Sequence, residues 1–139
     1  MDAETSAMYR VFIDGASPEL RAAIDDALAV EPSEITDTLV ALEDGVAAGT
    51  ASLRPFGDEL EVKKVFVTVP SRGQGLSRRI MLELEGIARV RGVASLVLQT
   101  GPLQVPAIRL YESLGYVRIP PYGKYGVIED TLCFRKVLD

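Results

Sequence analysis

Histidine is absent from this 139-residue chain, and its absence removes whole classes of chemistry. Serine and cysteine hydrolases depend on a histidine base, and many zinc sites depend on histidine ligands, so we expect neither kind of site. We expect no bound metal. Any proton transfer must then fall to Glu, Asp, Tyr, Lys or water.

Cysteine is almost absent, since Cys133 is the single one, and no internal disulfide can form. The apolar neighbours Leu132 and Phe134 are typical of a β-strand. This setting favours a buried structural thiol over a reactive nucleophile.

Long apolar runs are also missing. No stretch approaches the roughly 20 residues that span a bilayer, and residues 1–6 lack the basic region and apolar core of an export signal. We therefore expect a cytoplasmic protein that does not contact a membrane.

Basic residues are fewer than acidic residues, so the net charge is −5 and the sequence pI is near 4.8. A nucleic-acid surface normally carries a clustered basic stripe, so no nucleic-acid partner is expected. A small polar or charged molecule is a better candidate. With 47% hydrophobic residues, the chain has enough material for one core, and residues 1–139 read as a single domain.

The spacing of apolar and turn residues predicts alternating strands and helices. Ser17 and Pro18 are typical of a helix start, and that helix should end near Val30. The last helix should be followed by a final strand near 131–137. The expected strands before it are 9–13, 38–42, 47–54, 60–67 and 95–98, the last a buried strand pairing in parallel. The fold class is therefore α/β (α+β), with a mixed, mostly antiparallel central sheet of six to seven strands flanked by helices.

The most informative stretch runs from an apolar strand at 65–67 through Arg72-Gly73-Gln74-Gly75 into a helix. Glycines let the backbone approach a ligand closely, and the free N–H groups of a helix start favour phosphate. Arg72 and Arg78 or Arg79 could add charge. The pattern predicts a diphosphate cradle, although a strand, a glycine turn and a helix can also be a plain connection.

A second stretch, 98–116, follows a buried strand with a short helix that ends at Gly115. Together the two stretches resemble the GNAT family of N-acetyltransferases, over about residue 38 to the C-terminus. The segment 72–77 is similar to the family's pyrophosphate-binding motif, with Ser77 in place of the usual small apolar residue. The second motif is matched at Ala107, Ile108, Leu110, Tyr111, Gly115 and Tyr116, with Gln104 where many members have asparagine.

The resemblance implies an acetyl-CoA-dependent N-acetyltransferase that transfers an acetyl group to a primary amine within a ternary complex. It implies acetyl-CoA as cosubstrate and no metal. The cofactor-binding residues that it implies are Phe66, Val67, Arg72, Gly73, Gln74, Gly75, Leu76, Ser77, Arg78, Gln104, Ala107 and Tyr111.

By the same resemblance, Tyr111 is the general acid for the departing thiolate, and the Val67 N–H polarises the thioester carbonyl. The alternative for Tyr111 is core packing. Glu61 is the candidate general base, through water, and Glu59 is a weaker one. The alternative is a solvated strand face on which Glu61 pairs with Lys63.

Acceptor recognition is the least constrained feature. The segment 31–37 leaves room for at most one extra helical turn, which suggests an open acceptor site, and the loop 119–126 carries two tyrosines that either border this site or pack. Glu129 and Asp130 could line its mouth or serve solubility. The preferred acceptor is a small-molecule amine or amino-acid-like compound. A noncatalytic acyl-CoA sensor or interaction module, a protein N-terminal or lysine acetyltransferase, and a homodimer all stay open.

Overall fold

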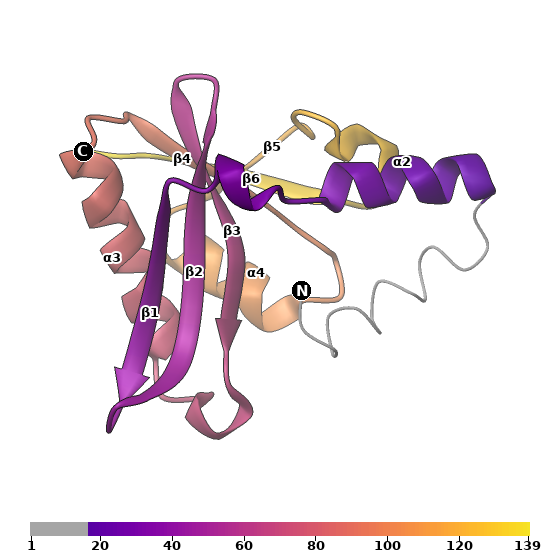
Figure 1. Cartoon of the computed structure of the whole chain (residues 1–139). Coiled ribbons are helices and arrows are strands. Elements are labelled where there is room, and N and C mark those ends of the chain that lie inside the picture. Colours follow the sequence, from indigo (N-terminus) through magenta and orange to yellow (C-terminus); the bar gives the residue numbers. More distant parts are fainter. Residues whose placement is uncertain (1–16) are drawn as a thin grey trace.

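A six-stranded sheet forms the centre of the computed structural model, which describes residues 17–139 (Figure 1). The expected strand at 9–13 lies outside the described residues. The strands follow the order β1-β2-β3-β4-β6-β5 across the sheet. Their bounds are β1 Asp37–Glu43, β2 Val46–Phe56, β3 Glu59–Val67, β4 Ser95–Thr100, β5 Val117–Ile119 and β6 Leu132–Val137.

Strands β1, β2 and β3 form an antiparallel meander, as the sequence predicted. Asp44 and Gly45 both have positive φ, 51° and 80°, in the two-residue turn between β1 and β2. Two left-handed residues suit the right-handed twist of the flanking strands, so the turn sets the register of this hairpin. Between β2 and β3, one left-handed residue, Gly57 with φ of 59°, forms the turn that sets the register.

The parallel contact between β3 and β4 is short. It comprises the pairs Leu60 with Leu96 and Glu61 with Val97. Further along β3, Lys64 has φ of 56° and the register with β2 shifts, which marks a β-bulge. A bulge bends its strand and increases the local twist. The expected buried parallel strand is confirmed, and the strands separate soon after they pair.

Helices cover the two faces of the sheet. On one face, α3 (Leu76–Val90) and α4 (Val105–Ser113) pack on the main core, which includes Leu84 and Phe134. On the other, α2 (Pro18–Leu28) and the 3-10 helix η3 (Tyr125–Val127) pack around Cys133, the neighbour of Phe134 in β6. Successive residues of a strand point to opposite faces, so β6 separates these two clusters.

The remaining connections agree with the expected pattern. Ser17 caps α2 by accepting a hydrogen bond from the Leu20 N–H at 3.1 Å, and α2 ends at Leu28, two residues before the expected end. A single turn, η1 (Pro32–Glu34), follows, and another, η2 (Val69–Ser71), precedes α3. Within residues 17–139, no helix is both long and apolar enough to cross a membrane.

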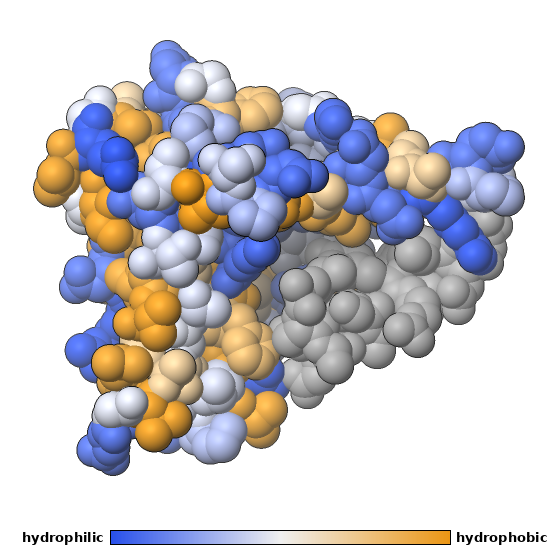
Figure 2. All heavy atoms as spheres, viewed as in Figure 1, coloured by the Kyte–Doolittle hydropathy of each residue, from blue (hydrophilic) through white to orange (hydrophobic). Residues whose placement is uncertain are grey.

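Apolar side chains gather on the lower part of the meander, over β1 and β2 (Figure 2). Val40, Leu42 and Val46 are 53%, 64% and 69% exposed. Among the described strands, β1 pairs only with β2, so this surface lies at an edge of the sheet.

Close packing of β2 against α3 gives a first prediction. A Cβ at Gly49 would lie 2.8 Å from Ile80 Cδ1 and 3.1 Å from the Phe66 carbonyl oxygen. We expect Gly49→Ala to lower the free energy of unfolding by about 1–3 kcal/mol through overpacking. Gly86→Ala on α3 is the control, since its Cβ meets nothing within 4 Å, and it should stabilise by about 0.5–1 kcal/mol. Urea denaturation of both variants is the measurement, and equal stability of Gly49→Ala and wild type would contradict the packing.

Candidate active site

A cavity of about 580 Å³ opens between the end of β3, the loop that leads into α3, and α4. Every predicted cofactor-binding residue lines it except Gln74, whose side-chain amide donates to the Pro70 carbonyl at 3.4 Å. The structure adds residues that the motifs did not single out. These are Val65, Ser71, Leu103, Pro106 and Leu110.

The cradle is built from backbone conformation. Gly73 and Gly75 have φ of 78° and 77°, in the left-handed region that side chains with a Cβ avoid. Gly75 is the N-cap of α3 and no side chain caps this helix, in contrast to Ser17 on α2. The first N–H groups of a helix lack partners within the helix, so the start of α3 can bind an anion at the cavity wall.

Two arginines are positioned at this wall. Arg72 donates from Nε to the Val67 carbonyl at 3.0 Å, and its guanidinium lies 5.7 Å from the Phe66 ring centre. Arg78 donates to the Ser113 hydroxyl at 3.2 Å. Both guanidinium groups therefore have defined positions and bring positive charge to the cavity.

Tyr111 lies on α4 with only 7% of its surface exposed. Its ring centre is 6.0 Å from that of Tyr116 and 6.2 Å from that of Phe134, so it packs in the main core. The same residue also lines the cavity. Tyr111 thus packs in the core and also borders the cavity. Its role as the general acid stays a prediction.

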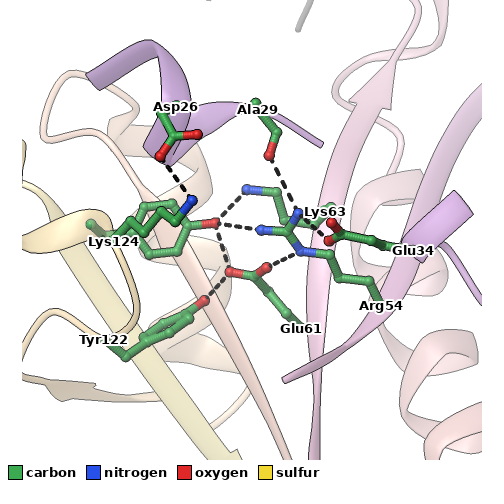
Figure 3. Close-up of polar contacts among 9 residues, drawn as sticks. Asp26, Ala29, Glu34, Arg54, Glu61, Lys63, Tyr122 and Lys124 are labelled. Atoms are coloured by element: carbon green, nitrogen blue, oxygen red, sulfur yellow. Dashed lines mark hydrogen bonds and ion pairs between the residues drawn. The ribbon is translucent and has the colours of Figure 1, made fainter. Parts of the chain in front are cut away.

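Glu61 is buried on the opposite face of β3, with 1% of its surface exposed (Figure 3). Oε1 accepts from Arg54 Nε at 2.6 Å, while Oε2 accepts from the Tyr125 hydroxyl at 2.7 Å and from the Tyr122 hydroxyl. The solvated-face alternative is therefore wrong, because three donors surround this carboxylate. Its role as a general base stays a prediction.

Lys63 joins the same cluster, donating to the Tyr125 hydroxyl at 2.7 Å. Burial lowers the pKa of Lys63, although the charge of Glu61 opposes this effect. Burial, reinforced by the negative charge of Glu61, raises the pKa of Tyr125 and of Tyr122. Both phenols therefore keep their protons, and each hydroxyl donates a hydrogen bond to Glu61.

Arg54 is the member of this cluster that the sequence analysis missed. It also donates to the Ala29 carbonyl at 3.3 Å and to Glu34 at 3.2 Å, so it ties the end of α2 and η1 to the sheet. A signal was present, because Arg54 stands directly opposite Glu61 in the β2–β3 hairpin. The turn at Gly57-Asp58 implies this register, and opposite charges facing each other across strands are a stabilising pair.

The other acidic candidates lie elsewhere. Glu59 accepts from Arg135 at 2.7 and 2.9 Å and from the Ser95 hydroxyl at 2.7 Å, and the hydrogen bonds from Arg135 hold the pKa of Glu59 below its usual range. Glu129 and Asp130 lie in an exposed turn before β6. None of the three lines the cavity.

The parallel pairing of β3 with β4 ends after two residue pairs, and the glycine loop before α3 and Tyr111 of α4 line one cavity. The model of the acetyltransferase (GNAT) family matches residues 4–116. A curated relative, the IAA acetyltransferase of Azospirillum brasilense, is 37% identical over 72% of this chain and 67% of its own length. Other curated relatives are longer, and the chain spans about half of their length.

Solved structures agree. A Klebsiella pneumoniae protein assigned to the acyl-CoA N-acyltransferases is 27% identical, with a TM-score of 0.73 over 91% of this chain and 92% of that one. The PaiA N-acetyltransferase of Thermoplasma acidophilum, solved with coenzyme A, is 15% identical and has a TM-score of 0.65 over 93% and 85%. The chain belongs to the GNAT family, whose members are acetyl-CoA-dependent N-acetyltransferases, so the resemblance found in the sequence is confirmed.

Proposed function

We propose that this protein transfers the acetyl group of acetyl-CoA to the primary amine of a small-molecule or amino-acid-like acceptor, directly and within a ternary complex. One observation carries the proposal: a single cavity is lined both by the glycine loop at the uncapped start of α3 and by Tyr111 of α4. The name of the Azospirillum brasilense relative refers to IAA and not to a protein, which favours a small acceptor.

The residues present fit acetyl-CoA. The N–H groups that follow Gly73 and Gly75 would bind the pyrophosphate, with Arg72 and Arg78 supplying charge. Gln104 and Ala107, at the start of α4, border the other side of the cavity. The apolar residues Val65 and Leu110 would exclude water around the arm that carries the thioester.

The proposed chemistry needs two groups beside the thioester. The amine nitrogen bonds to the carbonyl carbon, the carbon–sulfur bond breaks, and the departing thiolate takes a proton from the Tyr111 hydroxyl. The nitrogen loses one proton as the amide forms, and this proton restores the Tyr111 hydroxyl through water. The Val67 N–H would polarise the carbonyl oxygen as negative charge develops on it. Both groups lie on cavity-lining residues, which come from β3 and α4.

Glu61 is the proposed proton acceptor, and its contacts restrict how a proton would reach it. Both carboxylate oxygens already accept hydrogen bonds. Oε1 accepts from Arg54, and Oε2 accepts from Tyr122 and Tyr125. A tyrosine oxygen would accept the ammonium proton, directly or from water, and pass its own proton to Glu61. This relay conserves protons and leaves the phenol neutral.

The direct test of the function is an acceptor screen that follows release of the CoA thiol from acetyl-CoA, with amines, amino acids and peptides in separate arms. Turnover with small amines supports the proposal. Turnover with peptides alone would replace it by protein acetylation, and acetyl-CoA binding without any transfer would replace it by a sensor.

The cradle itself gives a prediction for Gly75→Val. A β-branched residue is strained at φ of 77°, so the loop must shift and acetyl-CoA binding should be abolished in calorimetry. Gly45→Val is the matched control, because Gly45 has φ of 80° in the β1–β2 turn. It should lose stability but keep its affinity. Unchanged affinity in Gly75→Val would mean that the pyrophosphate binds elsewhere.

For Tyr111→Phe we expect a turnover rate lower by about 10- to 1,000-fold, the range for losing an acid or one aligned donor. The ring remains, so the melting temperature and the dissociation constant for acetyl-CoA should change little. Tyr116→Phe is the control: it removes the hydroxyl that donates to Glu85 at 3.3 Å and should alter stability more than turnover. If Tyr111→Phe loses stability and keeps its rate, the tyrosine is a packing residue.

For Glu61→Gln, the acetylation rate should fall most at low pH, where the acceptor is protonated, and recover as the pH rises and the amine becomes neutral. Glu59→Gln is the control, since Glu59 is bound to Arg135 and should show no such profile. Rate profiles across pH for both variants are the measurement. A loss that is the same at every pH would assign Glu61 a positioning role through Tyr122 and Tyr125.

A further inference from the structure

Two tyrosine hydroxyls donate to the same oxygen of Glu61, and their other contacts differ (Figure 3). Tyr122 and Tyr125 both belong to the segment between β5 and β6. Tyr125 is 2% exposed, whereas Tyr122 is half-buried. The remaining donor to Glu61 is Arg54, whose guanidinium stays protonated and cannot pass a proton on. A proton that reaches this buried carboxylate through its donors therefore comes through one of the two phenols.

The oxygen of Tyr125 is fully used by other donors. Lys63 Nζ donates to it at 2.7 Å, and Arg54 Nη2 donates to it at 3.4 Å. An ammonium and a guanidinium have no acceptor, so these bonds use the two lone pairs of the phenol oxygen, and its single hydrogen is directed to Glu61. Lys63 thus fixes the direction of the Tyr125 hydrogen bond. Tyr125 can accept a further proton only by losing one of these cations.

The oxygen of Tyr122 has a different environment. Its hydroxyl donates to Glu61 Oε2, and no donor from residues 17–139 is bound to its oxygen. The ring is held by packing, because its centre lies 4.8 Å from that of Phe56 and 5.1 Å from that of Tyr125, both edge-to-face. A phenol oxygen can accept two hydrogen bonds. Tyr122 therefore combines an open acceptor position with a hydrogen that already points to the carboxylate.

The charged groups around the two phenols leave Glu61 as the destination of a proton. Glu34 pairs with Arg54 at 3.2 Å. Asp26 of α2 pairs with Lys124 at 2.8 Å. The charged and titratable groups that face the phenols, apart from these pairs, are Glu61, Lys63, Arg54, Cys133 and Arg135.

We infer that Tyr122 takes the proton of the acceptor ammonium and that Tyr125, held by Lys63, is a positioning residue, an inference that rests on the proposed function. The ammonium N–H bond breaks as an O–H bond forms on the Tyr122 oxygen, and the original Tyr122 proton passes to Glu61 Oε2. Glu61 becomes a neutral carboxylic acid, and water takes this proton by the reverse path after the product leaves. Burial and the charge of Glu61 raise the pKa of Tyr122, and this transfer forms no phenolate.

Tyr122→Phe tests the inference, because it keeps the ring and removes the hydroxyl. The substrate is the most active small amine of the acceptor screen, and kcat/KM is measured across pH. Below the pKa of that amine we expect a fall of about 100-fold, as for losing a general base, and recovery as the amine becomes neutral. The dissociation constant for acetyl-CoA should not change, since Tyr122 does not line the cavity.

Tyr125→Phe is the matched control. It leaves the buried Lys63 ammonium without its phenol partner, so the melting temperature without ligand should fall by about 5–10 °C, and by less in Tyr122→Phe. Any loss of rate in Tyr125→Phe should be the same at every pH. Tyr116→Phe is a second control: its hydroxyl donates to Glu85, so it should keep the pH profile of the wild type. An unchanged melting temperature in Tyr125→Phe would contradict the positioning role.

The outcomes distinguish this inference from the proposed function. If wild type acetylates the amine and Tyr122→Phe keeps the wild-type pH profile, the inference is wrong while the function stands. A loss in Tyr122→Phe that is equal at every pH would make Tyr122 a positioning residue and would also overturn it. If Tyr125→Phe shows the low-pH loss, alone or together with Tyr122→Phe, the assignment to Tyr122 is wrong. If wild type acetylates no acceptor, both are overturned.

Discussion

The separation of two parallel strands is the constraint on which the site depends. Strands β3 and β4 are paired through two residue pairs, and the bulge at Lys64 bends β3 beyond them. Each strand then leads through a loop into a helix, α3 after β3 and α4 after β4, so both helix starts border the same opening. A longer parallel ladder would close this space and remove the cavity.

Strand β3 also links the two faces of the protein. Its end supplies Val65, Phe66 and Val67 to the cavity, while Glu61 lies buried on the face toward α2 and η3. A buried charge is tolerated only when it is paired and hydrogen-bonded, and Arg54 with two tyrosine hydroxyls meets this need. The same contacts tie α2, η1 and the loop before β6 to the sheet, so the geometry of this face depends on one carboxylate.

Much of the fold was predictable because its signals are local. Glycine turns separate the strands of the meander, and an apolar stripe defines α3, so these elements appear within a residue or two of their expected bounds. The conformation of the glycine loop was predictable for the same reason, since Gly73 and Gly75 lie next to the start of α3. The contact of Glu61 with Tyr122 and Tyr125 was not, because 61 and 64 residues separate the partners.

By itself, the sequence determined which chemistry is excluded by the lack of histidine, where the backbone turns, and which glycine loop opens α3. These features depend on residue type and on nearest neighbours along the chain. Only the tertiary structure decided that Glu61 is buried and not solvated, that Gln74 lies outside the cavity wall, and that the buried Thr100 hydroxyl accepts and donates no hydrogen bond within residues 17–139. Burial and hydrogen bonding depend on which distant segments pack together. The local sequence pattern of a strand is the same whether or not another segment packs against it.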